Sequence, residues 1–176
     1  MKSNIYLIGF MGTGKSTVSQ CLAKLLGYEE IDTDEWISCQ QKQSITQIFE
    51  TYGEQKFREM ETKLLQGLGK KEHKIISCGG GMALRQENVA LMRQNGAVVL
   101  LTAEPETILS RVKEDHGRPI LDGNMNLEYI QDLLEHRMPY YQEAGEIVIA
   151  TDQKAPQEIA QDIEKNLRIG KICFAF

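Results

Sequence analysis

The stretch Gly9-Phe10-Met11-Gly12-Thr13-Gly14-Lys15-Ser16 has the pattern G-x-x-x-x-G-K-S of a phosphate-binding loop, or P-loop. The apolar run from Asn4 to Ile8 precedes it and predicts a buried strand. Apolar residues then recur at helical spacing up to Gly27, where the helix is expected to stop. A strand, a glycine loop and a helix in this order direct backbone N–H groups and the positive end of the helix dipole at a phosphate chain. The loop therefore predicts a nucleotide site at the end of the first strand.

Two side chains of this loop have chemistry of their own. Lys15 can reach the β- and γ-phosphates, and the Ser16 hydroxyl can ligate Mg²⁺. The ATP-binding residues predicted here are Gly12, Thr13, Gly14, Lys15, Ser16 and Thr17.

Length and composition indicate a single globular domain, over residues 1–176. The formal net charge of −5 gives no sign of a nucleic-acid or membrane surface, so an anionic ligand must be held by local basic groups. The four cysteines are widely spaced and form no C-x-x-C pair, which argues against a disulfide framework or a zinc site. No signal peptide or membrane span is visible. We expect a cytoplasmic protein.

Further buried strands are predicted over residues 30–33, 74–78, 97–102 and 147–151. Helical patterns lie between them, over residues 34–41, 44–52, 54–68, 84–94, 105–114, 126–143 and 156–168. Alternating strands and helices predict an α/β fold with a parallel sheet, whose ligand binds at the carboxyl ends of the strands. Pro139 is expected to kink or end the helix in which it lies.

Two carboxylates, Asp32 and Asp34, stand at the end of the second predicted strand. One can contact Mg²⁺, directly or through water, and the other can face an acceptor hydroxyl as a general base or an orienting group. The alternative is that Asp34 only caps a helix that starts at Glu35.

Each of four other features can be interpreted as part of a functional site or as an ordinary structural element. Glu61 lies one turn beyond Arg58 and can hold its guanidinium, although such a pair alone is typical of a solvated surface salt bridge. Gly79-Gly80-Gly81 allows close approach of a ligand to the backbone, or forms a flexible turn. Arg137 suits an anion clamp or a helix-end cation. The polar residues 115–126 suit a lid or a plain connector.

Taken together, these motifs resemble the shikimate kinase family from Gly9 to about Pro156. The resemblance rests on the P-loop, Asp32-x-Asp34, Phe57-Arg58 with Glu61, Gly79-Gly80-Gly81, Arg118-Pro119 and Arg137-x-x-x-Tyr141. It implies the nucleoside-monophosphate-kinase-like P-loop fold, a three-layer α/β/α structure with a five-stranded parallel sheet in the order 2-3-1-4-5. It also implies a monomer that transfers the γ-phosphoryl group of ATP to the 3-hydroxyl of shikimate with the help of Mg²⁺.

The resemblance also assigns roles, which fit the chemistry of the side chains. Guanidinium groups would bind the shikimate carboxylate, and a carboxylate would hold the acceptor hydroxyls. The implied catalytic residues are Lys15, Asp34 and Arg118. The implied substrate-binding residues are Asp34, Arg58, Gly79, Gly80, Gly81 and Arg137, with a substrate-binding helical region over about 34–61. Ser16 and, through water, Asp32 would hold Mg²⁺. Arg111 and Pro156 would enclose adenine, and Arg118 would act from a lid over about 112–125.

The chain departs from the family pattern in two places. The lid reads Arg118-Pro119-Ile120-Leu121 where the family often has two leucines after the proline, a change that conserves volume. The tail over residues 171–176 matches no motif, and we expect it to pack on the body or to be disordered.

Two other functions fit part of this pattern. A gluconate kinase of similar fold also has an acceptor with a carboxylate and hydroxyls, but the Arg58/Glu61 pair, the glycine triplet and Arg137 favour shikimate. A regulatory module that binds a nucleotide without phosphoryl transfer would be expected to lack at least one of Asp34, Arg58, Arg118 and Arg137.

Overall fold

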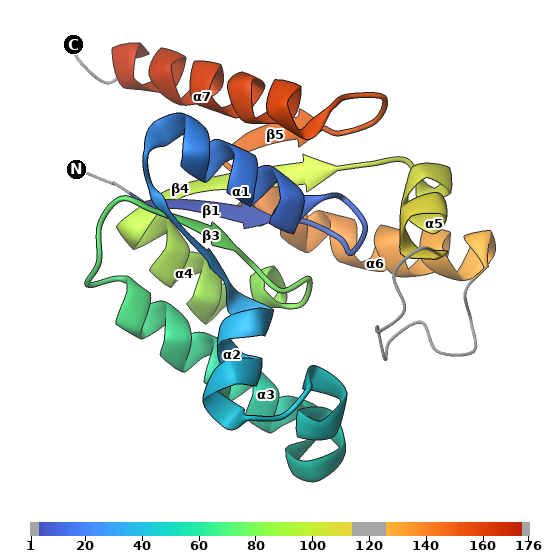
Figure 1. Ribbon diagram of the computed structural model, residues 1–176. Helices are drawn as coiled ribbons and strands as arrows, with labels where there is room; N and C mark the ends of the chain where they lie inside the picture. The colour runs from blue at the N-terminus through green and yellow to red at the C-terminus, as the bar shows by residue number, and fades with distance from the viewer. Residues whose placement is uncertain (1–3, 114–125, 174–176) are drawn as a thin grey trace.

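The molecule is built around a twisted parallel sheet (Figure 1). A computed structural model describes residues 4–113 and 126–173. Within these ranges the strands are β1 (Asn4–Ile8), β2 (Glu29–Asp32), β3 (Lys74–Ser77), β4 (Gly96–Thr102) and β5 (Ile147–Ala150). They lie in the order β2-β3-β1-β4-β5 and pair in parallel throughout. The predicted α/β class and the order 2-3-1-4-5 are confirmed.

Helices cover both faces of this sheet. They are α1 (Lys15–Leu26), α2 (Thr33–Gln41), α3 (Ile45–Leu68), α4 (Gln86–Asn95), α5 (Pro105–Lys113), α6 (Leu127–Ala144) and α7 (Pro156–Cys173), with a 3₁₀ turn, η1 (Met82–Leu84). Helices α1 and α7 lie on one face, while α4 and α6 lie on the other (Figure 1). In the described part of the chain, no helix is both long enough and apolar enough to cross a membrane.

The central strand β1 explains why two hydrophobic cores form. All five of its residues are buried, and successive side chains point to opposite faces of a strand. Ile5 and Leu7 pack in the cluster beneath α1 and α7, whereas Tyr6 and Ile8 belong to the cluster on the opposite face. Burial on both faces is the reason that β1 reads as a continuous apolar run.

The sequence predicted helix interruptions at Gly53 and at Pro139, and the structure treats the two positions differently. The predicted helices 44–52 and 54–68 form α3, which is interrupted at Gly53 by a non-helical backbone (φ 77°, ψ 166°). The helix α6, by contrast, does not end at Pro139 but continues to Ala144. Tyr141 and Ala144 lie beyond this proline and are fully buried, so packing against the core keeps the last turn helical. Helix α7 reaches Cys173, within the tail that matched no motif.

Candidate active site

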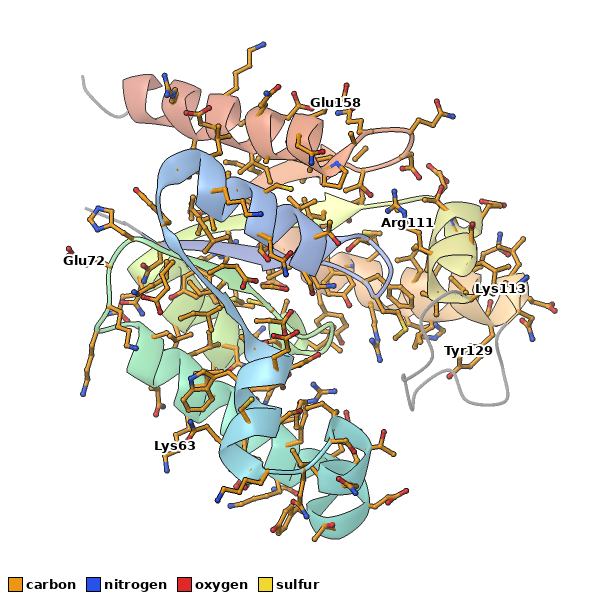
Figure 2. The ribbon with its side chains drawn as sticks, viewed as in Figure 1. Lys63, Glu72, Arg111, Lys113, Tyr129 and Glu158 are labelled. Carbon is orange, nitrogen blue, oxygen red and sulfur yellow. The ribbon has the colours of Figure 1, made fainter. Side chains whose placement is uncertain are left out.

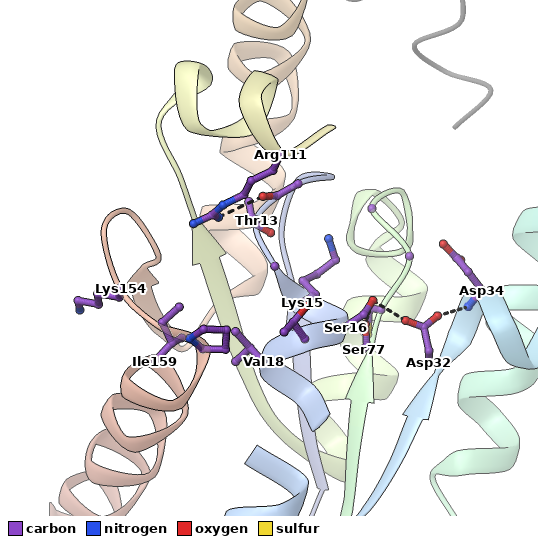
Figure 3. Close-up of a pocket in the computed structure, with 17 residues that line it drawn as sticks. Thr13, Lys15, Ser16, Val18, Asp32, Asp34, Ser77, Arg111, Lys154 and Ile159 are labelled. Carbon is purple, nitrogen blue, oxygen red and sulfur yellow. Dashed lines mark hydrogen bonds between the residues drawn. The ribbon is translucent and has the colours of Figure 1, made fainter. Parts of the chain in front are cut away.

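A cavity of about 500 Å³ opens where β1, β2 and β3 end. It is lined by 12 residues that the sequence pointed to: Gly12, Thr13, Gly14, Lys15, Ser16, Thr17, Asp32, Asp34, Gly79, Gly80, Arg111 and Pro156. Figure 3 shows Lys15 and Ser16 in the middle of this cavity, between Arg111 on one side and Asp34 on the other. The remaining described candidates, Arg58, Gly81 and Arg137, do not line this cavity. Arg58 packs against Gly81, and Arg137 lies over Phe10 of the P-loop.

The P-loop owes its shape to glycine. Gly14 caps the start of α1 in the left-handed region (φ 90°), which side chains with a Cβ rarely adopt. Gly9 has a positive φ as well, and a Cβ there would collide with the Leu101 carbonyl. The Lys15 ammonium donates hydrogen bonds to the carbonyls of Gly9 (2.9 Å) and Phe10 (2.8 Å). These bonds hold a cation at the mouth of the loop, where phosphate oxygens would approach it.

The carboxylate of Asp32 joins the loop to α2. The Ser16 hydroxyl donates to Asp32 Oδ2 at 2.7 Å, and Ser77 Oγ lies 3.3 Å from Ser16 Oγ. Asp32 Oδ1 accepts from the backbone N–H groups of Asp34 and Glu35, so Asp32 is the N-cap of α2. These oxygens are of the kind that Mg²⁺ prefers.

Asp34 lies in the first turn of α2, so the suggestion that it caps this helix is wrong. Strand β2 ends at Asp32, and the helix carries Asp34 over the third strand's carboxyl end instead. A Cβ at Gly79 would lie 2.6 Å from Asp34 Oδ1 and 3.1 Å from Glu61 Oε1. The Gly79 N–H donates to Thr33 Oγ1 at 2.9 Å, which fixes this close approach.

Arg58 and Glu61 form a buried pair, not the solvated one that their spacing alone suggested. Arg58 Nη1 donates to Glu61 Oε2 at 2.9 Å, and the Glu61 side chain is 0% exposed. Arg58 Nη2 also donates to Glu54 at 2.9 Å. Burial raises the pKa of Glu61 to about 7, although the Arg58 charge opposes this shift. A Cβ at Gly81 would collide with the Arg58 guanidinium, so glycine leaves the room that this side chain fills.

Arg137 lies on α6, next to Phe10 and Tyr141. Its guanidinium stands 5.7 Å from the Phe10 ring centroid, and its Nη1 is buried with no hydrogen-bond partner among the described residues. The neighbouring Tyr141 hydroxyl donates to the Gly80 carbonyl at 2.6 Å. Burial raises the pKa of Tyr141, an effect that Arg137 opposes. A buried donor without a partner is costly and marks a place for an acceptor such as a carboxylate.

Arg111 lies at the end of the cavity away from Asp34 and connects the P-loop to Thr151 (Figure 3). It reaches from α5 and donates to the Gly12 carbonyl (3.2 Å), to Thr151 Oγ1 (3.0 Å) and to the Thr151 carbonyl (3.0 Å). Pro156 and Ile159 line the same end of the cavity. One planar cation and two apolar side chains suit the flat ring of a base.

Sequence reasoning missed several side chains of this site. Ser77, Thr33, Thr151 and Lys154 were not singled out, yet Ser77 and Lys154 line the cavity, and the two threonines hold Gly79 and Arg111. The signal available for Ser77 and Thr33 was their position at or just beyond a strand's carboxyl end. Arg118 and most of the predicted lid, residues 114–125, lie outside the described residues.

Comparison with known proteins identifies the family. A model of the shikimate kinase family matches residues 11–168. The chain belongs to the shikimate kinase family. A shikimate kinase of Caldicellulosiruptor bescii is 44% identical over 160 residues, which cover 91% of this chain and 92% of that protein. A shikimate kinase of Dehalococcoides mccartyi is 40% identical over 167 residues, or 95% and 94% of the two chains.

Comparison with solved structures indicates the same family. The structure described as a shikimate kinase from Acinetobacter baumannii in complex with shikimate is 37% identical and superposes with a TM-score of 0.91, covering 96% of this chain and 94% of that one. The chain is therefore an ATP-dependent kinase of the shikimate kinase family.

Proposed function

We propose that this kinase transfers the γ-phosphoryl group of ATP to the 3-hydroxyl of shikimate, giving shikimate 3-phosphate and ADP. The observation that carries the proposal is the juxtaposition of a phosphate-binding loop with Asp34 and with the Arg58 and Arg137 guanidinium groups. A small acceptor with hydroxyls at one end and a carboxylate at the other matches this order of groups. The reaction belongs to the biosynthesis of chorismate and the aromatic amino acids.

The donor half of the site binds ATP. The P-loop N–H groups and the α1 dipole receive the phosphates, and Lys15 moves from the loop carbonyls to the γ-phosphoryl oxygens. Adenine lies between Arg111 and Pro156. Positive charge fixed at this position stabilises the charge that spreads over the transferring group.

The oxygens near Ser16 fit a magnesium ion. Ser16 would be its protein ligand, and Asp32, 2.7 Å from the hydroxyl, would hold it through water. An ion held mainly by ATP phosphates and water needs only one or two protein ligands. When bound, Mg²⁺ neutralises phosphate charge.

The acceptor half orients shikimate. Arg58 and Arg137 bind its carboxylate from two sides, and the buried Glu61 keeps Arg58 in position. The backbone of Gly79, Gly80 and Gly81 lets the ring approach. Asp34 accepts a hydrogen bond from the attacking hydroxyl. The hydroxyl oxygen forms the new bond to phosphorus as the bond to ADP breaks, and its proton passes to Asp34 or to solvent.

Arg118, outside the described residues, stays a predicted contact to the transferring group. The thiols of Cys21, Cys39 and Cys78 are free, which supports a reducing, cytoplasmic location. We expect a monomer, which size-exclusion chromatography with light scattering tests.

A coupled assay of ADP release tests the function. With Mg²⁺ and ATP, we expect turnover with shikimate and none with gluconate or nucleoside monophosphates, and chelation of the metal should stop it. Turnover with gluconate or a nucleotide alone would refute the proposal. ATP binding without any turnover would instead support the regulatory module.

A further inference from the structure

A second cavity, of about 620 Å³, lies between α2 and α3. We call it the α2–α3 groove and define it by Trp36, Lys56, Met60, Lys63, Leu64 and Lys71. Among the described residues it shares no lining side chain with the nucleotide cavity. Its volume falls within the range of about 300–1,000 Å³ that is usual for small-molecule sites.

The floor of the groove is apolar. Leu64 is buried (4% exposed) and Met60 is half-buried, while the Trp36 indole beside them remains 41% exposed. An indole is among the largest apolar surfaces a chain can present, and leaving it in water next to a hollow is unfavourable. A flat apolar ring placed against Trp36 would remove this surface from water.

The rim of the groove is cationic. Lys56, Lys63 and Lys71 line it, in a chain whose net charge is −5. Glu59 is the one carboxylate among the described lining residues, and it pairs with Lys56 at 2.9 Å. Figure 2 shows the Lys63 side chain extending from α3 away from the sheet. The ammonium groups of Lys63 and Lys71 thus lie beside an apolar floor, where they can receive an anion. Lys71 also interacts electrostatically with Glu29, a carboxylate outside the groove lining.

The two helices that line the groove also carry residues of the proposed acceptor site. Trp36 follows Asp34 by two residues on α2, and Met60 stands between Arg58 and Glu61 on α3. A molecule wedged between the two helices would change the spacing of Asp34 and Arg58. Two ligands that act on one pair of helices are coupled energetically, and the coupling is reciprocal.

We propose that the α2–α3 groove binds a small aromatic carboxylate, and that its occupant changes the enzyme's affinity for shikimate. The aromatic ring packs on Trp36 and Met60, and the carboxylate pairs with Lys63 and Lys71. The second half of this proposal rests on the proposed function; the first half does not.

A fluorescence titration tests the site. Trp36 is the single tryptophan of the chain, so its emission reports on the groove directly. The probe is para-nitrobenzoate, an aromatic carboxylate that quenches indole fluorescence, and it is added with shikimate present in excess. The control compound is para-nitrobenzyl alcohol, which has the same ring but no charge. We expect saturable quenching by the carboxylate and about tenfold weaker binding in the K63Q/K71Q variant, as for two partly exposed ion pairs.

The control variant is K24Q/K165Q, which loses the same charge from exposed positions outside the groove and should bind the probe like wild type. Replacing Lys63 and Lys71 by arginine should preserve binding. Quenching that does not saturate, or equal affinity in wild type and K63Q/K71Q, would overturn the site. These fluorescence measurements require no catalysis, so their outcome does not depend on whether the chain phosphorylates shikimate.

Calorimetric titration of shikimate with and without saturating para-nitrobenzoate tests the coupling. We expect the probe to change the dissociation constant in wild type and in K24Q/K165Q but not in K63Q/K71Q. An equal change in all three proteins would mean competition at the acceptor site and would refute the coupling. No change in wild type would refute it as well.

Discussion

The Ser16 hydroxyl donates a 2.7 Å hydrogen bond to Asp32 Oδ2, while the other oxygen of Asp32 caps helix α2. One carboxylate therefore links the phosphate-binding loop to the helix that carries Asp34. In the proposed function the loop belongs to the ATP side of the site and the helix to the shikimate side, so the relative placement of the two substrates would depend on this residue.

Substitutions of Asp32 should separate its role as the N-cap of α2 from its role beside Ser16. Asp32→Ala should lose the cap and about 1 kcal/mol of unfolding free energy, whereas Asp32→Asn should keep most of that stability because asparagine is a good N-cap. Both variants should use Mg²⁺ and ATP poorly, since neither retains the carboxylate near Ser16. Urea unfolding and the Mg²⁺ dependence of the rate measure the two effects. Normal Mg²⁺ dependence in Asp32→Asn would contradict the assigned role.

Arg58→Ala should chiefly weaken shikimate binding, by about 2–4 kcal/mol, because a buried charge-assisted contact to the carboxylate is lost. Calorimetric titration with shikimate measures this. Lys56→Ala is a suitable control, because Lys56 is exposed on the same helix and pairs with Glu59. Unchanged shikimate affinity in Arg58→Ala would refute the assignment.

The buried Glu61 should make stability depend on pH. Burial raises its pKa from 4.5 to about 7, so between these values the folded state keeps a proton that the unfolded state has released. The contribution is fully present below about pH 4.5 and is lost as the pH rises through about 7. Relative to Glu61→Gln, which cannot ionise, wild type should lose unfolding free energy over this window. Urea unfolding of both proteins across it gives the test, and parallel pH profiles would contradict it.

Gly81→Ala tests whether the glycine triplet makes room for Arg58. The added methyl group would collide with the guanidinium and displace it, so shikimate affinity should fall about tenfold while the KM for ATP stays near normal. Gly67→Ala, where a methyl group meets nothing within 4 Å, is the control on α3. If the two variants bound shikimate equally well, this packing argument would be wrong.

The sequence predicted the fold because its signals are local. The P-loop pattern and the continuous apolar runs of β1 and β4 depend only on neighbouring residues, and the structure places both as expected. The helical pattern over residues 126–143 predicted α6 to within one residue at each end. Whether Pro139 ends that helix could not be decided locally, because the helix continues past it through the burial of Tyr141 and Ala144. Packing of this kind depends on residues far away in the chain.

The same distinction holds within the site. Lys15, Ser16 and Asp34 could be found from motifs, since their positions relative to the loop and to strand ends are set locally. The burial of Glu61 could not, because it depends on Gly79 and Asp34 approaching from another strand and helix. Thr151 gave no signal at all, although its side chain is fully buried and holds Arg111.

Thr151 therefore provides a final test of the ATP side. Its hydroxyl accepts from Arg111 and donates to the Thr102 carbonyl, both at 3.0 Å. Thr151→Val should free Arg111 from one of its anchors and raise the KM for ATP several-fold, with a loss of about 1 kcal/mol of stability for the missing side-chain hydrogen bonds. The Thr102 carbonyl stays paired, because it also accepts from the Thr151 backbone N–H at 2.9 Å. Thr151→Ser keeps the hydroxyl and should retain the normal KM. Initial rates at varied ATP compare the two, and an equal KM in both would mean that Arg111 is positioned by the Gly12 and Thr151 carbonyls alone.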